Sequence, residues 1–217
     1  MSQPQPIYIL SDKKVQHAIN LPMIEISYIS TKVDLSSYDA LLFTSKNAIK
    51  ALDSFDESWK SIASYVIAPQ TAKVLESMGG NLHFVGEKSH GDDFAQEIAQ
   101  QLHGKKVLYV CGKKVVSNLT TLLNENGVSC ESLVVYETVC KKYEQKITLP
   151  KGSVVIFSSP STIECFFKNI TSWDESYSAI SIGKTTAKYF PNYITPFIAN
   201  STSLDACVEK AFEILNT

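Results

Sequence analysis

Hydroxyl and lysine side chains follow almost every predicted strand of this 217-residue sequence. These strand-end residues are Ser11, Lys13 and Lys14; Thr44, Ser45 and Lys46; Gln70 and Thr71; Lys113 and Lys114; Ser158, Ser159 and Ser161; and Gly183, Lys184, Thr185 and Thr186. Ligands of open parallel sheets bind at the carboxyl ends of the strands. We therefore expect these donors to share one rim and to bind an anion.

The same clusters open predicted helices, whose first amides are unpaired donors near the positive end of a dipole. Each such helix start favours an anion by about 0.3–1 kcal/mol. A competing interpretation is that the Ser and Thr side chains only cap these helices. Capping explains any single residue but not why all the clusters share one rim, so a ligand with many negative groups is predicted.

Other catalytic patterns are missing from the sequence. It contains no G-x-G-x-x-G, Walker, H-E-x-x-H or G-x-S-x-G motif. The four histidines, His17, His83, His90 and His103, show no metal-ligand spacing and do not follow strand ends. We expect them in surface or loop positions, and we expect no metal and no cofactor.

Composition indicates a globular protein with 44% hydrophobic residues. The 20 Lys and Arg against 22 Asp and Glu leave a net charge of −2, which argues against a nucleic-acid partner. No export signal and no run of roughly 18 apolar residues is found, so we expect a cytoplasmic protein without a membrane partner. The five cysteines are odd in number and form no C-x-x-C pair, so reduced thiols are predicted.

The chain reads as two similar halves. Residues 38–50 match 152–164, residues 66–73 match 181–188, and residues 7–14 match 107–114. Short apolar runs alternate with segments of helical period, including helices at 92–102 and 203–215. The predicted strands are 7–11, 24–30, 40–44, 65–68, 82–85, 107–111, 132–136, 153–158, 179–182 and 194–199. This pattern predicts an α/β protein of two flavodoxin-like, doubly wound lobes, each with a five-stranded parallel sheet.

Several of these segments together resemble one family. They are Leu-Phe-Thr-Ser-Lys-Asn-Ala at 42–48, its echo Ile-Phe-Ser-Ser-Pro-Ser-Thr at 156–162, Gly-Lys-Thr-Thr-Ala-Lys at 183–188 and Val-Val-Tyr-Glu-Thr at 134–138. In this order and spacing they look like the uroporphyrinogen-III synthases. The resemblance covers nearly the whole chain.

The resemblance implies a domain arrangement. One lobe takes both termini, residues 1–32 and 149–217, and the other is inserted as residues 37–139. Residues 33–36 and 140–148 would then be the hinge linkers, and the two donor-lined rims would face each other across a shared gap.

The resemblance also implies a reaction. Hydroxymethylbilane loses its terminal hydroxyl to give an azafulvene, the substituted carbon of ring D is attacked, and a spiro intermediate rearranges with ring D inverted. Its eight carboxylates suit the predicted rim of donors. Because hydroxymethylbilane closes unaided to the type I isomer, positioning matters more than a strong acid or base.

The resemblance assigns roles to particular residues. Tyr136 is the candidate proton donor, with packing between the lobes as its alternative role. Thr71, Thr186, Ser45 and Ser159 would bind substrate carboxylates. A monomer suits the family, and hydroxymethylbilane synthase, which makes the substrate, is a candidate partner.

Two other functions stay open at this point. One is a non-catalytic two-lobe binding or sensor domain for an anionic small molecule. The other is a flavin protein, which the flavodoxin-like topology alone would allow.

Overall fold

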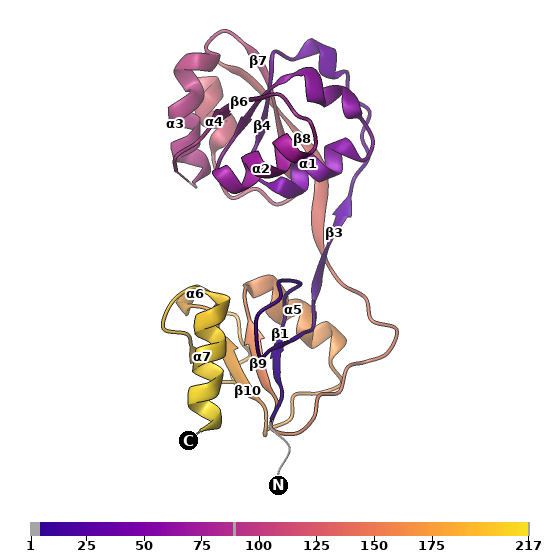
Figure 1. Ribbon diagram of the computed structural model, residues 1–217, viewed down its shortest axis with the longest axis vertical. Coiled ribbons are helices and arrows are strands. Elements are labelled where there is room, and N and C mark those ends of the chain that lie inside the picture. Colours follow the sequence, from indigo (N-terminus) through magenta and orange to yellow (C-terminus); the bar gives the residue numbers. More distant parts are fainter. Residues whose placement is uncertain (1–4, 89, 217) are drawn as a thin grey trace. The chain divides into compact units, whose positions relative to one another are not determined.

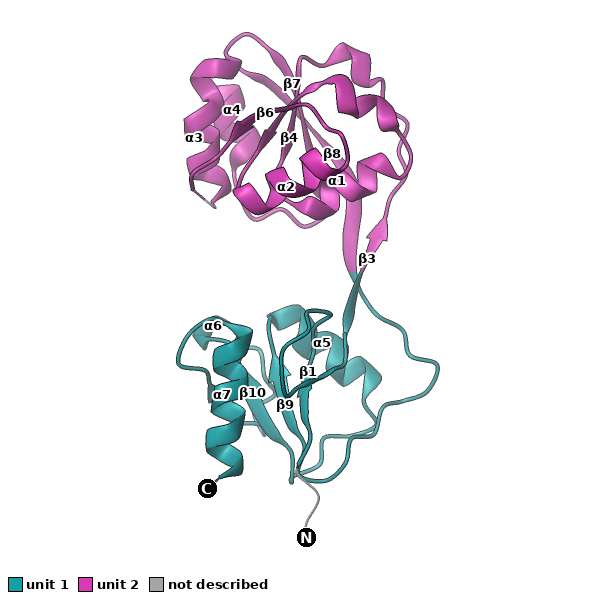
Figure 2. Cartoon of the chain, viewed as in Figure 1, with its two compact units in different colours: residues 1–25, 139–217 teal, residues 26–138 magenta. Residues whose placement is uncertain are grey.

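The computed structural model describes residues 5–88 and 90–216 and divides the chain into two compact units. Unit 1 comprises residues 1–25 and 139–217, and unit 2 comprises residues 26–138 (Figure 2). The chain passes from one unit to the other within two strands, β3 (Ile24–Tyr28) and β8 (Ser129–Cys140).

Unit 1 contains a parallel sheet in the order β2-β1-β9-β10-β11. Its strands are β1 (Ile7–Ile9), β2 (Ile19–Asn20), β9 (Val154–Phe157), β10 (Ser178–Ser181) and β11 (Phe197–Ile198). Its helices are α5 (Pro160–Asn169), α6 (Lys184–Ala187) and α7 (Leu204–Leu215), labelled in Figure 1. Numbered within the unit, the strand order is 2-1-3-4-5, which is the flavodoxin order.

Unit 2 contains a sheet in the order β3-β8-β7-β4-β5-β6. Besides β3 and β8 its strands are β4 (Ala40–Phe43), β5 (Ala63–Val66), β6 (Leu82–Val85) and β7 (Lys106–Gly112). Its α-helices are α1 (Lys46–Asp53), α2 (Pro69–Ser77), α3 (Gly91–Leu102) and α4 (Leu119–Glu125). Two 3₁₀ turns, Leu35–Ser37 and Glu57–Ser61, precede β4 and β5.

The predicted sequence repeat appears as equivalent places in the two sheets. The matched segments put β7 where unit 1 has β1, β4 where it has β9, and β5 where it has β10. Strands β8-β7-β4-β5-β6 therefore follow the same spatial order as β2-β1-β9-β10-β11. Unit 2 differs because β4, the equivalent of the third strand of unit 1, comes first in the chain among these five strands.

Both sheets are covered on two faces, because alternate strand residues enter different cores. In β4, Leu41 and Phe43 pack with α1 and α2, whereas Ala40 and Leu42 pack with α3 and α4. Figure 1 shows these two helix pairs apart from each other. In unit 1, β9 likewise divides its side chains between a core with α5 and a core with α7.

The predicted sheets were wrong about the strand at 24–30, both in the sheet that it joins and in its direction. Residues 24–30 were expected in the sheet of the first lobe, but β3 lies at the edge of the unit 2 sheet beside β8. The hydrogen bonds Ile29 N to Val135 O, 2.8 Å, and Lys141 N to Met23 O, 2.9 Å, show an antiparallel pairing. Strand β2 takes the vacant edge of unit 1, and its two residues are too few to show a sequence period.

The unit boundaries fall at 25/26 and 138/139, whereas the sequence placed linkers at 33–36 and 140–148. Residues 141–147 are held to unit 1 by hydrogen bonds. The Tyr143 hydroxyl donates to Pro22 O at 2.7 Å, and Asn169 Nδ2 donates to Lys141 O at 2.9 Å. Strand β8 itself continues to Cys140, four residues beyond the predicted strand end.

Reduced thiols were predicted for all five cysteines, and this is wrong for two of them. Cys140, at the end of β8, and Cys165, in α5, form a disulfide with their Cα atoms 5.1 Å apart. Their separation of 25 residues gave no sign of it in the sequence. Cys111, Cys130 and Cys207 are free and buried.

Within residues 5–88 and 90–216, no helix has the length and apolar character needed to cross a membrane.

Candidate active site

The strand orders place a topological switch point in each unit. The chain leaves β1 towards β2 on one side and returns to β9 on the other, and in unit 2 the corresponding neighbours are β7 and β4. Ligands of doubly wound sheets bind beyond the carboxyl ends of the strands at such a point. The residues after these four strands are therefore the ones that could contact a ligand.

The switch point of unit 2 opens into a pocket with a volume of about 240 Å³. Hydroxyls and one lysine give it a donor-rich lining, and none of the described residues that line it is acidic. The lining consists of Thr44, Ile67, His90, Gly91, Tyr109, Gly112, Lys114, Val115, Val116, Ser117 and Tyr136. This pocket can take an anionic group.

Thr44 and Tyr109 join across the two central strands of unit 2. The hydroxyl of Tyr109, on β7, lies 2.7 Å from Thr44 Oγ1, directly after β4. Tyr109 is only 3% exposed, and this burial raises the pKa of its hydroxyl. Both groups are therefore protonated and uncharged at neutral pH.

Tyr136 lies on β8, half-buried, and its ring covers Gly112 of β7. A Cβ at Gly112 would lie 2.6 Å from Tyr136 Cζ and 2.9 Å from its hydroxyl. Lys113 N donates to Tyr136 O at 2.8 Å, and Lys113 Nζ pairs with Glu137 at 2.8 Å. These contacts fix the strand that carries the predicted proton donor.

Ser45 and Lys46 begin α1 beside the pocket. Ser45 is the N-cap, with its Oγ accepting from Asn47 N at 3.2 Å, and Lys46 is exposed. After the neighbouring strand β5, Gln70 is exposed in the first turn of α2, but Thr71 is only 7% exposed. Of the predicted residues in these two turns, only Thr44 lines the pocket.

In unit 1, Ser11 follows β1, and Ser158 and Ser159 follow β9, so they share the second switch point. Ser11 Oγ accepts from Lys13 N at 3.1 Å, while the Lys13 side chain is exposed. Ser159 caps α5 and forms a capping box with Thr162. Ser158, Ser159 and Ser161 are half-buried.

The segment 183–186 starts the short helix α6 after β10. Gly183 is its N-cap, Lys184 and Thr185 are exposed, and Thr186 is 5% exposed. The equivalent threonines Thr71 and Thr186 are thus both buried, and the exposed donors of these turns are their neighbours.

Eight pocket residues were absent from the predicted site: Ile67, His90, Gly91, Tyr109, Gly112, Val115, Val116 and Ser117. Tyr109 lies inside a strand, and only residues after strands had been considered. His90 occupies an exposed N-cap position, as expected of a loop histidine, but it also lines the pocket. Lys114, one of the lysines after the β7 strand, lines it too.

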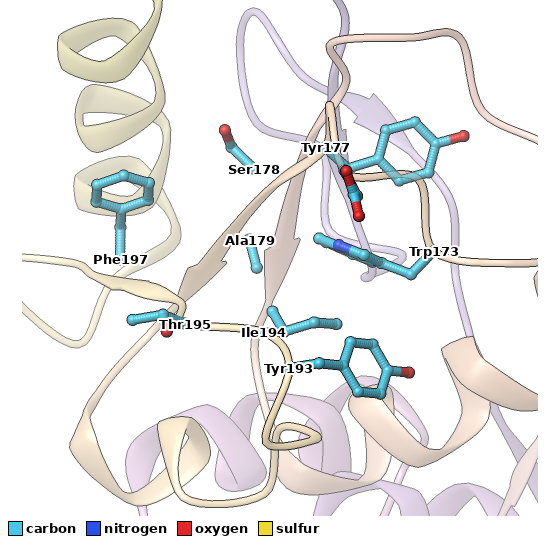
Figure 3. Close-up of a pocket in the computed structure, with 9 residues that line it drawn as sticks. Trp173, Tyr177, Ser178, Ala179, Tyr193, Ile194, Thr195 and Phe197 are labelled. Carbon is cyan, nitrogen blue, oxygen red and sulfur yellow. The ribbon is translucent and has the colours of Figure 1, made fainter.

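A second hollow, of about 460 Å³, lies in unit 1 at the amino end of β10. Figure 3 shows Trp173, Tyr177 and Tyr193 on one side of it and Phe197 on the other. None of the predicted site residues lines this hollow. It lies at the end of the sheet opposite to the strand ends that carry the donors.

Comparison with known proteins gives the family. The family model described as "Uroporphyrinogen-III synthase HemD" matches residues 13–209. The chain belongs to the uroporphyrinogen-III synthase family. It is an enzyme of tetrapyrrole biosynthesis with the α/β fold of that family.

Two relatives of the uroporphyrinogen-III synthase family show the extent of the similarity. The uroporphyrinogen-III synthase of Chlorobaculum parvum is 25% identical over 185 residues, which are 76% of this chain and 75% of that protein. The crystal structure of uroporphyrinogen-III synthetase from Helicobacter pylori 26695 superposes with a TM-score of 0.78. It is 30% identical and covers 97% of this chain and 99% of its own.

Proposed function

We propose that this chain cyclises hydroxymethylbilane to uroporphyrinogen III, with inversion of ring D and loss of water. The observation that carries the proposal is the pocket of unit 2. There Thr44, Tyr109, Tyr136 and Lys114 line one small space, and none of the described residues of its lining is acidic. Such a lining suits the carboxylate side chains of a polyanionic substrate.

The capping serines support binding as well as helix formation. The Oγ atoms of Ser45 and Ser159 each accept a backbone N–H, so each hydroxyl proton is still available for a substrate carboxylate. The two roles are compatible because a hydroxyl accepts and donates at once. We assign Ser45 to the substrate contacts of unit 2 and Ser11, Ser158 and Ser159 to those of unit 1.

We assign the proton that starts the reaction to Tyr136. Its hydroxyl would protonate the terminal hydroxyl of hydroxymethylbilane, the C–O bond would break, and water would leave while the pyrrole nitrogen supplies the electron pair that forms the azafulvene. Loss of a pyrrole proton in the final rearrangement returns a proton to the site. The enzyme's remaining task is to hold the substituted carbon of ring D near the azafulvene and to exclude the geometry that gives the type I isomer.

Tyr136→Phe tests this assignment. The ring over Gly112 is retained and only the hydroxyl is lost, so the fold should survive. General acid catalysis contributes about 10²–10⁴-fold, and we therefore expect turnover to fall by about a hundredfold with KM changed little. Turnover is measured from freshly prepared hydroxymethylbilane, and circular dichroism checks the fold.

A Tyr136→Phe variant with wild-type turnover would remove Tyr136 from this role. We further infer a monomer that acts in the cytoplasm, as suits an enzyme of this family. Hydroxymethylbilane synthase is the candidate partner because its unstable product is the substrate here.

A further inference from the structure

Tyr109 is a buried tyrosine that reaches from the core to the strand-end edge of unit 2. On β7 it is in register with Leu42 of β4, and its hydroxyl bonds to Thr44, two residues beyond Leu42. It lines the pocket together with Tyr136 and Ser117. Its hydroxyl therefore belongs to the site even though its ring belongs to the core.

The fold itself does not require a hydroxyl at this place. The row Tyr109, Leu42 and Tyr65 in unit 2 occupies the place of the row Ile9, Ile156 and Ile180 in unit 1. Unit 1 thus builds the same three strands with isoleucine where unit 2 has Tyr109. The hydroxyl of Tyr109 is accordingly a feature of the pocket of unit 2.

A count of protons gives this hydroxyl a role. Tyr109 and Thr44 each have one proton to donate, and the 2.7 Å bond between them uses one of the two. Burial raises the pKa of Tyr109, so its hydroxyl keeps its proton at neutral pH. When Tyr109 is the donor, the proton of Thr44 is left free to point into the pocket.

We propose that Tyr109 is a positioning residue, which donates to Thr44 Oγ1 and thereby directs the Thr44 proton at a substrate carboxylate. The proposal rests on the proposed function, because it takes hydroxymethylbilane as the ligand. It makes the Thr44–Tyr109 pair a unit in binding, in which neither hydroxyl works fully without the other.

The test measures KM and kcat for Tyr109→Phe, Thr44→Val and the double variant with hydroxymethylbilane. A net hydrogen bond of about 1 kcal/mol corresponds to roughly a fivefold change in KM. We expect KM to rise about fivefold in Tyr109→Phe and at least as much in Thr44→Val, with kcat nearly unchanged. The double variant should equal Thr44→Val, since residues that act as a pair are not additive.

Two further variants separate positioning from packing. Thr44→Ser keeps the hydroxyl, so adding Tyr109→Phe to it should again raise KM about fivefold. Tyr65→Phe removes a hydroxyl from the same row of the sheet, outside the lining of this pocket, and should leave KM unchanged.

Three results would overturn the inference: an unchanged KM in Tyr109→Phe, multiplied effects in the double variant, or loss of the fold in Tyr109→Phe as seen by circular dichroism. If the wild-type protein yields only type I product, the proposed function fails and this inference with it. Type III product together with an unchanged KM in Tyr109→Phe overturns the inference alone.

Discussion

At the scale of single residues, Gly112 shows what the site requires of its neighbours. It is not among the glycines with positive φ, so backbone conformation does not demand glycine there. Space does, because a Cβ would lie within 2.9 Å of three atoms of the Tyr136 ring and hydroxyl. Gly112 therefore sets the position of the proposed proton donor.

Gly112→Ala should move the Tyr136 ring and lower turnover roughly tenfold to a hundredfold, since small displacements of reacting groups cost this much. Combined with Tyr136→Phe it should add little, because no hydroxyl is left to displace. The measurement is kcat for the four proteins of this cycle. An equal loss from Gly112→Ala in both backgrounds would show that Gly112 acts elsewhere.

At the scale of secondary-structure elements, the starts of α1 and α5 combine a structural and a chemical role. Ser159 caps α5 through Thr162 N at 3.3 Å, and Ser45 caps α1. Removing the side chain cannot show whether Ser159 caps α5 or also binds substrate, because Ser159→Ala abolishes both functions. A substitution that keeps the cap and changes the charge decides it.

Ser159→Asp and Ser159→Asn form the matched pair. Both residues are good N-caps, so the free energy of unfolding should stay within about 0.5 kcal/mol of the wild type. The carboxylate of Asp repels substrate carboxylates, so we expect KM to rise at least about tenfold for Ser159→Asp and far less for Ser159→Asn. Equal KM values for the two variants would leave Ser159 as a cap alone.

The elements themselves were largely predictable from the sequence. Apolar runs located β4, β7 and β9 because buried parallel strands are continuously hydrophobic. Amphipathic stripes placed α3 within one residue of its observed start. The partner of β3 was not predictable, because its residues are only half-buried or exposed and carry no sign of which sheet they join.

The candidate site was less predictable for a related reason. Thr44, Lys114 and Tyr136 were found because they follow strands or match a family segment. Tyr109 lies within β7, where the pattern reads as core, and Gly112 has no side chain to mark it, so only the pairing of β7 with β4 and β8 brings them to the pocket. The contact between distant strands is a property of the fold and not of any local segment.

At the scale of the whole molecule, three buried free thiols link stability to pH. Burial raises the pKa of Cys111, Cys130 and Cys207 from 9.0 to about 11 in the folded chain. Above pH 9 the unfolded chain loses these protons first, so it is favoured as the pH rises. The contribution of the thiols is therefore fully present below pH 9 and is lost between pH 9 and about 11.

We expect the free energy of unfolding to change little from pH 8 to pH 9 and to fall between pH 9 and about 11, by about 1.4 kcal/mol per thiol for each pH unit. Urea unfolding at several pH values measures it, and Cys207→Ala serves as the control with a shallower slope. A flat profile between pH 9 and 10 would contradict the burial of these thiols.

The two units repeat one arrangement of strands, yet their donor sets differ. Unit 2 places four hydroxyl-bearing residues and a lysine around one pocket, whereas unit 1 supplies serines at the ends of β1 and β9. The sequence predicted this duplication from three matched segments, and the structure shows that it extends to the order of five strands in each sheet. The same arrangement of strands thus presents a different set of donors in each unit.

The most direct test of the account is the isomer that the purified protein makes. Fresh hydroxymethylbilane is incubated with the wild-type protein, and the oxidised products are separated into types I and III. The account predicts type III as the main product, because the enzyme holds ring D for inversion and its reaction is faster than the unaided closure to type I. Type I alone, at the rate seen without protein, would contradict it and would leave a binding module in its place.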